Sequence, residues 1–174
     1  MLMLRLMPKS ADFRIVLLEQ AHNRSQFDCG NEMLNRYLTQ QATQDVRRSL
    51  AQIYVLLAND NVVIGYYTIN ASMIEYANLP EPVRKNLPRY PIPAALIGRF
   101  ALDINYQGQG LARKLLGDAL HRAVAMSKTI GIYAVIVDAK DETVAEFYRK
   151  LGFLELSDSS LHLYLPIKTI KDAF

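Results

Sequence analysis

The chain has 174 residues, of which 51% are hydrophobic and 21% are charged, and its formal net charge at pH 7 is +3. This length predicts one domain, residues 1–174, and no apolar run reaches the ~18 residues that a membrane-spanning helix needs. The single cysteine, Cys29, excludes an intrachain disulfide and is typical of the reducing cytoplasm, where we expect the protein to be.

The first part of the chain predicts a leader, a strand and a helical stretch. Residues 1–12 form the predicted poorly ordered leader, because they lack the basic n-region and cleavage site of a signal peptide. Residues 13–18 are an apolar run and predict a strand. Residues 28–31 offer cap chemistry for one long helix or two short ones. Arg47 and Arg48 lie on its polar face, and its predicted buried face comprises Leu34, Tyr37, Leu38, Ala42, Val46 and Leu50.

The middle of the chain predicts a hairpin, a loop and a long strand. Residues 53–57 and 62–74 flank a turn signal at residues 59–61 and predict a β-hairpin. Five prolines between residues 79 and 93 exclude regular structure there and predict a long loop, either functional or merely a solvated connection. Residues 94–104 predict a strand with Arg99 in its middle. A cation in that position either lines a cleft or pairs with a carboxylate.

The last part of the chain alternates strand and helix signals. Residues 130–137 are continuously apolar, as in a strand covered on both faces. Asp141 is the predicted cap of a helix over residues 142–151, which Gly152 ends. Residues 153–156 and 161–165 predict two final strands. The order of the elements indicates an α/β layered domain with a mixed sheet.

Residues 107–112, Gln-Gly-Gln-Gly-Leu-Ala, lie between the long strand and an amphipathic helix. Gly108 and Gly110 let the backbone approach a ligand without Cβ clashes, and the first helical turn favours an anion, most plausibly a phosphate. The segment is not a Walker A loop and lacks the third glycine of the dinucleotide fingerprint. On this segment alone, an ordinary tight turn is the alternative.

Two motifs in this order resemble the GNAT superfamily of N-acetyltransferases. The pattern Gln107-x-x-Gly110-x-Ala112 resembles the family's acyl-CoA pyrophosphate loop, and residues 145–153, which contain Phe147-Tyr148, resemble a second family segment. The resemblance covers residues 13–166. It implies a GNAT-like layered fold, with a mixed, mostly antiparallel central sheet flanked by helices, in a single domain that transfers acetyl from acetyl-CoA.

The resemblance also implies roles for individual residues. Backbone groups of the glycine loop would hold the pyrophosphate, and those at 102 and 104 would lie along the pantetheine arm. The expected acetyl-CoA site therefore comprises Leu102, Ile104, Gln107, Gly108, Gln109, Gly110, Leu111, Ala112 and Arg113. Tyr148 is the candidate general acid for the CoA sulfur, with a packing role as the alternative. Asp103, Glu75 and Glu81 cannot be ranked as general bases, and a water chain is equally open.

A narrower resemblance concerns residues 27–30, 34–38, 44–45, 65–68, 87–91 and 98–103, which are similar to the tRNA-acetylating toxins of bacterial toxin–antitoxin pairs. It implies acetylation of the α-amine of aminoacyl-tRNA, which blocks translation. It also implies a ribbon-helix-helix antitoxin as partner and a homodimer. Cations must then face RNA phosphates, and the candidates are Arg47, Arg48, Arg89 and Arg99.

Two other functions remain open at this point. One is acetylation of protein N-termini or small amines, and the other is a non-catalytic acyl-CoA-binding module. We expect no metal, because His22, His121 and His162 are scattered and no Cys/His spacing indicates a metal site. We also expect no membrane partner.

Overall fold

The computed structural model describes residues 13–173, so the predicted leader, residues 1–12, lies outside the described part. Its centre is a mixed seven-stranded sheet of strand order β1-β2-β3-β4-β5-β7-β6, in which only the β4–β5 pair is parallel. This agrees with the predicted α/β layered fold. The strands are β1 (Arg14–Leu17), β2 (Gln52–Leu57), β3 (Val63–Ile74), β4 (Ile92–Leu102), β5 (Ala134–Asp138), β6 (Leu154–Leu156) and β7 (Ser159–Pro166).

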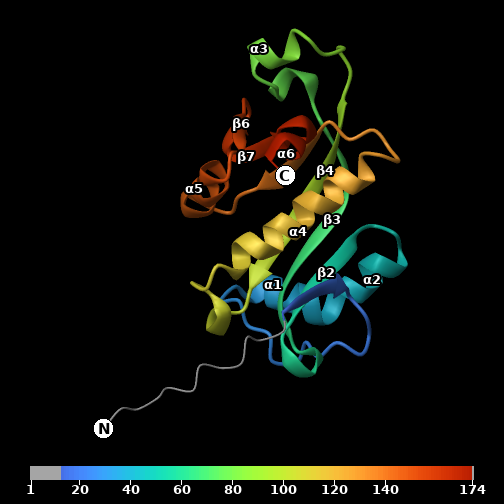
Figure 1. Cartoon of the computed structure of the whole chain (residues 1–174), viewed down its shortest axis with the longest axis vertical. Helices are drawn as coiled ribbons and strands as arrows, with labels where there is room; N and C mark the ends of the chain where they lie inside the picture. Colours follow the sequence, from blue (N-terminus) through green and yellow to red (C-terminus); the bar gives the residue numbers. More distant parts are fainter. Residues whose placement is uncertain (1–12, 174) are drawn as a thin grey trace.

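Helices cover both faces of the sheet. They are α1 (Glu32–Arg36), the π-helix η1 (Tyr37–Gln41), α2 (Ala42–Arg47), α3 (Glu81–Arg84), α4 (Leu111–Met126), α5 (Glu142–Lys150) and α6 (Ile167–Ala173), with 3₁₀ turns η2 (Asn59–Asn61), η3 (Tyr76–Asn78) and η4 (Ile104–Tyr106). Figure 1 shows α4 lying along β3 and β4, with α2 near one end of the molecule and α3 near the other. No helix within residues 13–173 is long and apolar enough to cross a membrane.

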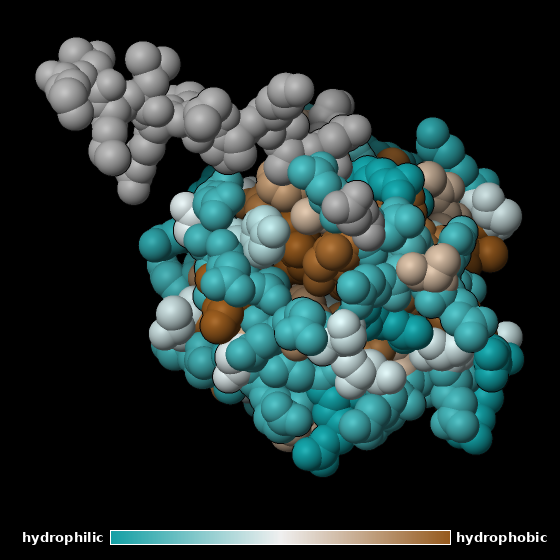
Figure 2. Space-filling model, turned by 90° about the horizontal axis from the view of Figure 1, so that it is seen from below, coloured by the Kyte–Doolittle hydropathy of each residue, from teal (hydrophilic) through white to brown (hydrophobic). Residues whose placement is uncertain are grey.

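The main core lies between the sheet and α4. The helix buries Leu115, Leu116, Ala119 and Ala123, which the 3.6-residue period places on one face. They pack with strand residues of alternating positions, such as Val135 and Val137. Two smaller hydrophobic cores lie on the opposite face of the sheet, one between the sheet and α1 and α2, and one between the sheet and α3. Seen from below, the surface is mostly hydrophilic around a recessed group of hydrophobic side chains (Figure 2).

The parallel strands β4 and β5 pair along only part of their length. Ala94–Ile97 of β4 pairs with Ala134–Val137 of β5, and no pairing between them continues to the end of β4 at Leu102. Opposite the separation, the β3–β4 register shifts between Tyr67 and Ile69, and the Arg99 N–H donates to the Thr68 hydroxyl at 2.9 Å. A bulge bends and twists a strand, so β4 leaves β5 and a gap opens between their carboxyl ends.

Several predicted elements differ from the observed ones. The proline-rich segment contains α3, because Pro82 lies in the first helical turn, where proline is tolerated. Strand β5 begins at Ala134 rather than at residue 130, since Ile130 is in the connection from α4 and is 57% exposed. Leu50 is 58% exposed because α2 ends at Arg47. Helix α6 forms where the sequence carries no clear signal.

Candidate active site

A cavity of about 560 Å³ lies where β4 and β5 separate. Its walls come from four parts of the chain: the turn and helix at residues 29–34, the end of β4, the glycine loop, and the end of β5 with α5. The lining residues are Cys29, Asn31, Met33, Leu34, Ile97, Gly98, Arg99, Phe100, Ala101, Leu102, Gln107, Gly108, Ala112, Asp138, Lys140, Thr143, Val144, Phe147 and Tyr148. The site lies at the carboxyl ends of adjacent parallel strands, the usual ligand position in α/β folds.

The glycine loop is shaped for an anion. Gly108 and Gly110 have φ of +77° and +78°, and a Cβ at either position would meet no atom within 4 Å, so the space above the loop is open. No side chain caps α4, and within residues 13–173 the first-turn N–H groups of Leu111, Ala112 and Arg113 have no hydrogen-bond acceptor. These features fit the pyrophosphate of acetyl-CoA.

The other predicted acetyl-CoA residues have distinct surroundings. Gln107 donates from Nε2 to the Leu102 carbonyl at 2.9 Å, which ties the loop to the end of β4. Gln109 and Arg113 are exposed beside the loop, and the Leu111 side chain is buried in the main core. Ile104 is outside the cavity lining, and its N–H donates to the Asp28 carbonyl at 2.9 Å. Of the predicted set, Leu102, Gln107, Gly108 and Ala112 line the cavity together, whereas Ile104, Gln109, Gly110, Leu111 and Arg113 lie outside its lining.

Tyr148 lies on α5 and forms part of the cavity wall. The side chain is 4% exposed and packs between Phe147 and Phe153, with ring centres 5.4 and 5.3 Å away. Burial raises the pKa of its phenol above the ordinary value, so the hydroxyl is protonated at neutral pH. It makes no hydrogen bond to any residue that the structure describes. A buried phenol with a free hydroxyl in a cavity wall can donate a proton to a ligand atom.

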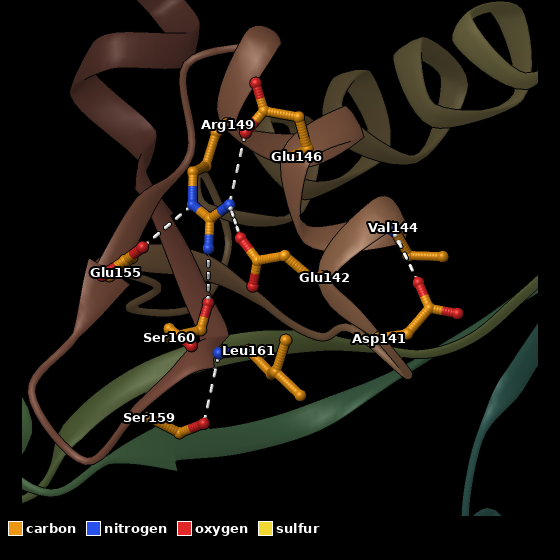
Figure 3. Close-up of polar contacts among 9 residues, drawn as sticks. All are labelled: Asp141, Glu142, Val144, Glu146, Arg149, Glu155, Ser159, Ser160 and Leu161. Atoms are coloured by element: carbon orange, nitrogen blue, oxygen red, sulfur yellow. Dashed lines mark hydrogen bonds and ion pairs between the residues drawn. The ribbon is translucent and has the colours of Figure 1, made fainter.

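Arg149 fastens α5 to the hairpin of β6 and β7 (Figure 3). Its guanidinium contacts the Glu142 carboxylate at 2.5 Å and the Glu146 carboxylate at 3.3 Å on the same helix. It also contacts the Glu155 carboxylate at 2.9 Å and donates to the Ser160 carbonyl at 3.1 Å. At the other end of α5, the Asp141 carboxylate caps the Val144 N–H at 2.9 Å, which confirms the predicted cap. The helix that carries Tyr148 is therefore held at both ends.

Arg149→Met is expected to lower the melting temperature and to reduce the kcat of acetyl transfer about tenfold, because small displacements of a catalytic group are costly. Methionine keeps an apolar stem but removes every contact of the guanidinium. Circular dichroism melting and initial rates measure the two effects. The control is Lys150→Met, which removes the neighbouring exposed cation. Equal behaviour of the two variants would contradict the anchoring role.

The three carboxylates considered as general bases lie outside the cavity lining. Asp103 is buried and structural, because its two oxygens accept from the N–H groups of Asp28 and Asn105 at 3.1 and 2.9 Å. Glu81 on α3 pairs with Lys85 at 3.6 Å. Glu75 precedes η3, next to α3 in the chain. None of them faces the site.

The four predicted RNA-contacting arginines are not in one place. Arg99 lines the cavity, and its guanidinium carbon lies 3.6 Å from the centre of the Tyr37 ring. Of the two alternatives, a residue that lines a cleft or one that pairs with a carboxylate, the structure supports the first. Arg47 and Arg48 are exposed at the end of α2, and Arg89 is exposed between α3 and β4. Figure 1 places α2 and α3 toward opposite ends of the molecule.

Several residues that line the cavity are not among those predicted from the sequence, for example Asp138, Lys140 and Met33. A signal for Asp138 exists, because it directly follows an apolar strand that runs parallel to its neighbour, and such strand ends carry ligand-binding residues. The position of Met33, 82% exposed at the cavity mouth, depends on how α1 packs and has no sequence signal. Among the described residues, no group of His, Cys, Asp and Glu side chains could hold a metal ion.

Comparisons with known proteins agree with this geometry. A family model described as an acetyltransferase (GNAT) domain matches residues 49–155. A tRNA-acetylating toxin of Mycobacterium tuberculosis is 31% identical over 87% of this chain and 90% of that protein. A solved structure of AtaT complexed with acetyl-methionyl-tRNAfMet is 34% identical, covers 94% of this chain and 99% of its own, and superposes with a TM-score of 0.88.

A second structure shows AtaT, as a tyrosine-to-phenylalanine variant, bound to the C-terminus of the antitoxin AtaR and acetyl-CoA. It is 30% identical, covers 94% of this chain and 98% of its own, and has a TM-score of 0.79. The family match spans more than half of this chain, and the relatives extend over most of it. With the glycine loop and the separated strands, these matches show that the chain belongs to the GNAT family of acetyl-CoA-dependent acetyltransferases.

Proposed function

We propose that this enzyme transfers acetyl from acetyl-CoA to the α-amine of aminoacyl-tRNA and thereby blocks translation, as the toxin of a toxin–antitoxin pair. The observation that carries the proposal is the cavity between β4 and β5, whose lining brings the glycine loop, the buried phenol of Tyr148 and the cations Arg99 and Lys140 together. The similarity to a tRNA-acetylating toxin and to AtaT in complex with acetyl-methionyl-tRNAfMet supports this acceptor.

The chain's own groups divide the work of the reaction. When bound, acetyl-CoA supplies a thioester whose C–S bond breaks as the N–C bond to the amine forms. The glycine loop and the start of α4 hold the pyrophosphate. Tyr148 donates its phenolic proton at the leaving sulfur, because a thiolate leaves more easily when it is protonated or hydrogen-bonded.

The charge of the cavity favours an anionic acceptor. Arg99 and Lys140 line it beside a single carboxylate, that of Asp138. An aminoacyl-tRNA carries phosphates close to its amine, and these would interact favourably with the two cations. A lysine-rich peptide would meet like charges instead. Acetylation of protein N-termini or small amines is therefore the second candidate, and its expected mark, an acidic cleft, is absent from this cavity of the described structure.

The experiment is transfer of radiolabelled acetyl from acetyl-CoA to a pool of charged tRNAs, beside the same pool after deacylation. We expect label on the charged pool alone, released by alkaline hydrolysis as the N-acetylated amino acid. Arg99→Met is expected to raise the KM for charged tRNA while the Kd for acetyl-CoA changes little. Protein that binds acetyl-CoA but labels neither pool would refute this function, and label on peptides or small amines would support the second candidate.

We propose further that the whole chain, residues 1–174, forms one acetyltransferase domain that acts in the cytoplasm as a homodimer. Its partner would be a ribbon-helix-helix antitoxin encoded next to it. The AtaT structure with the C-terminus of AtaR supports an antitoxin partner. Light scattering of the purified protein tests the dimer. Co-expression with the adjacent reading frame tests the antitoxin: its product should restore the growth of cells in which this toxin blocks translation.

A further inference from the structure

A carboxylate–imidazole–carboxylate chain begins in the wall of the cavity. Asp138 is the last residue of β5 and pairs in register with His162 of β7. The Asp138 Oδ1 atom lies 2.5 Å from His162 Nε2, and His162 Nδ1 lies 2.9 Å from Asp158 Oδ2. Each ring nitrogen faces a carboxylate oxygen, so the imidazole links the two carboxylates.

Asp138 is the only carboxylate among the described residues that line the cavity. Its Oδ1 is held by His162, and its Oδ2 has no hydrogen bond within residues 13–173. Asp138 therefore presents one oriented, unoccupied oxygen in the same cavity as the Tyr148 hydroxyl. The other titratable or charged groups that line the cavity are Cys29, Arg99 and Lys140. The other members of the carboxylate–imidazole–carboxylate chain are Asp158 and His162.

We propose that Asp138 is the catalytic residue that accepts the proton of the attacking amine, and that His162 is the positioning residue that holds its carboxylate. The inference rests on the proposed transfer of acetyl to an amine, but it does not depend on which amine is used.

The proton balance of the step is complete. An amine N–H donates to Asp138 Oδ2, and the nitrogen becomes strongly acidic as its bond to the acetyl carbon forms, so a carboxylate can take the proton. The C–S bond breaks, and the sulfur receives the proton of the Tyr148 hydroxyl. The side chains of Asp138, His162 and Asp158 are 58%, 32% and 35% exposed, so the proton on Asp138 passes to water. Tyr148 lines the cavity and regains its proton from water after CoA has left.

If the carboxylate–imidazole–carboxylate chain had a purely structural role, its loss would affect stability and kinetics differently. In that case the Asp138–His162 contact would only fasten β5 to β7, which already pair over five residues from Ala134 to Asp138. Loss of the carboxylate would then lower stability and would change catalysis equally at every pH. The two roles are separated by kinetics, not by loss of activity alone.

The experiment compares Asp138→Asn with the wild-type enzyme from pH 6 to pH 9, with charged tRNA as acceptor. We expect kcat to fall about 100-fold at pH 7, at the low end of general acid–base contributions, because the α-amine of an aminoacyl ester is weakly basic. The Kd for acetyl-CoA, measured by calorimetry, and the melting temperature should not change. The deficit should shrink as pH rises, because hydroxide replaces the missing base. Asp172→Asn, at an exposed carboxylate on α6, is the control.

His162 is tested by a pair of variants. His162→Gln retains an N–H donor toward Asp138 and should keep most of the kcat, whereas His162→Leu should lose about tenfold, since a misoriented base is less effective. Wild-type rates in Asp138→Asn at all pH values would overturn the proposal. So would a loss that is uniform with pH and accompanied by a lower melting temperature or weaker acetyl-CoA binding.

Failure of the proposed function can be told apart from failure of this inference. If the wild-type enzyme labels a peptide or a small amine but not charged tRNA, the proposed function fails and the same variants are measured on that amine. If it binds acetyl-CoA and acetylates no amine, both proposals fail.

Discussion

Tyr148→Phe is expected to lower the kcat of acetyl transfer about 1000-fold, within the range for general acid catalysis. The change removes one hydroxyl that makes no hydrogen bond to a described residue, and it leaves the ring packed between Phe147 and Phe153. Because burial raises the pKa of the phenol, the wild-type hydroxyl stays protonated through pH 6–9. Its ionisation should cause no alkaline loss of rate in that window. Single-turnover transfer measures the effect.

Tyr164→Phe is the matched control for this variant. Tyr164 is 1% exposed, its hydroxyl is buried without a hydrogen-bond partner in the described structure, and it lies outside the cavity lining. Removal of an unsatisfied buried hydroxyl should be neutral or stabilising by about 1 kcal/mol, with an unchanged kcat. If Tyr148→Phe keeps a wild-type kcat, Tyr148 serves packing and is not the acid.

Gly110→Val is expected to weaken acetyl-CoA binding by about 10- to 100-fold, since each factor of ten corresponds to 1.4 kcal/mol. Gly110 has φ +78°, and a β-branched residue in the left-handed region costs about 1–3 kcal/mol. The exposed loop can relieve this strain by relaxing, which turns the first-turn N–H groups of α4 away from the pyrophosphate. The new side chain also enters the open space above the loop. Calorimetric titration with acetyl-CoA measures the loss.

Gly117→Val provides the comparison within the same helix. Gly117 lies inside α4 with no positive φ, and a Cβ there would meet no atom within 4 Å. Valine has a higher helix propensity than glycine, so stability should rise by a few tenths of a kcal/mol and acetyl-CoA affinity should stay the same. Equal affinities of the two variants would show that the loop backbone does not hold the pyrophosphate.

Local signals predicted most of the elements correctly. The 3.6-residue period of α4, the Asp141 cap and the left-handed Gly152 at the end of α5 depend on near neighbours in the chain, which is why they can be read from sequence. The differences concern the proline-rich segment and the start of β5. The proline-rich segment, which the sequence predicts to be a loop, contains α3 with Pro82 in its first turn, and residue 130, predicted to begin a strand, lies in the connection before β5.

The sequence by itself determined the glycine loop, its strand-to-helix setting and the Phe147-Tyr148 segment, because each motif lies within about ten consecutive residues. Only the tertiary structure decided where the cavity forms, which depends on the length over which β4 and β5 pair. It also decided that Arg99 stacks on Tyr37 and that Asp138 meets His162. These contacts join residues far apart in the chain, so strand register and helix packing, rather than local periodicity, create them.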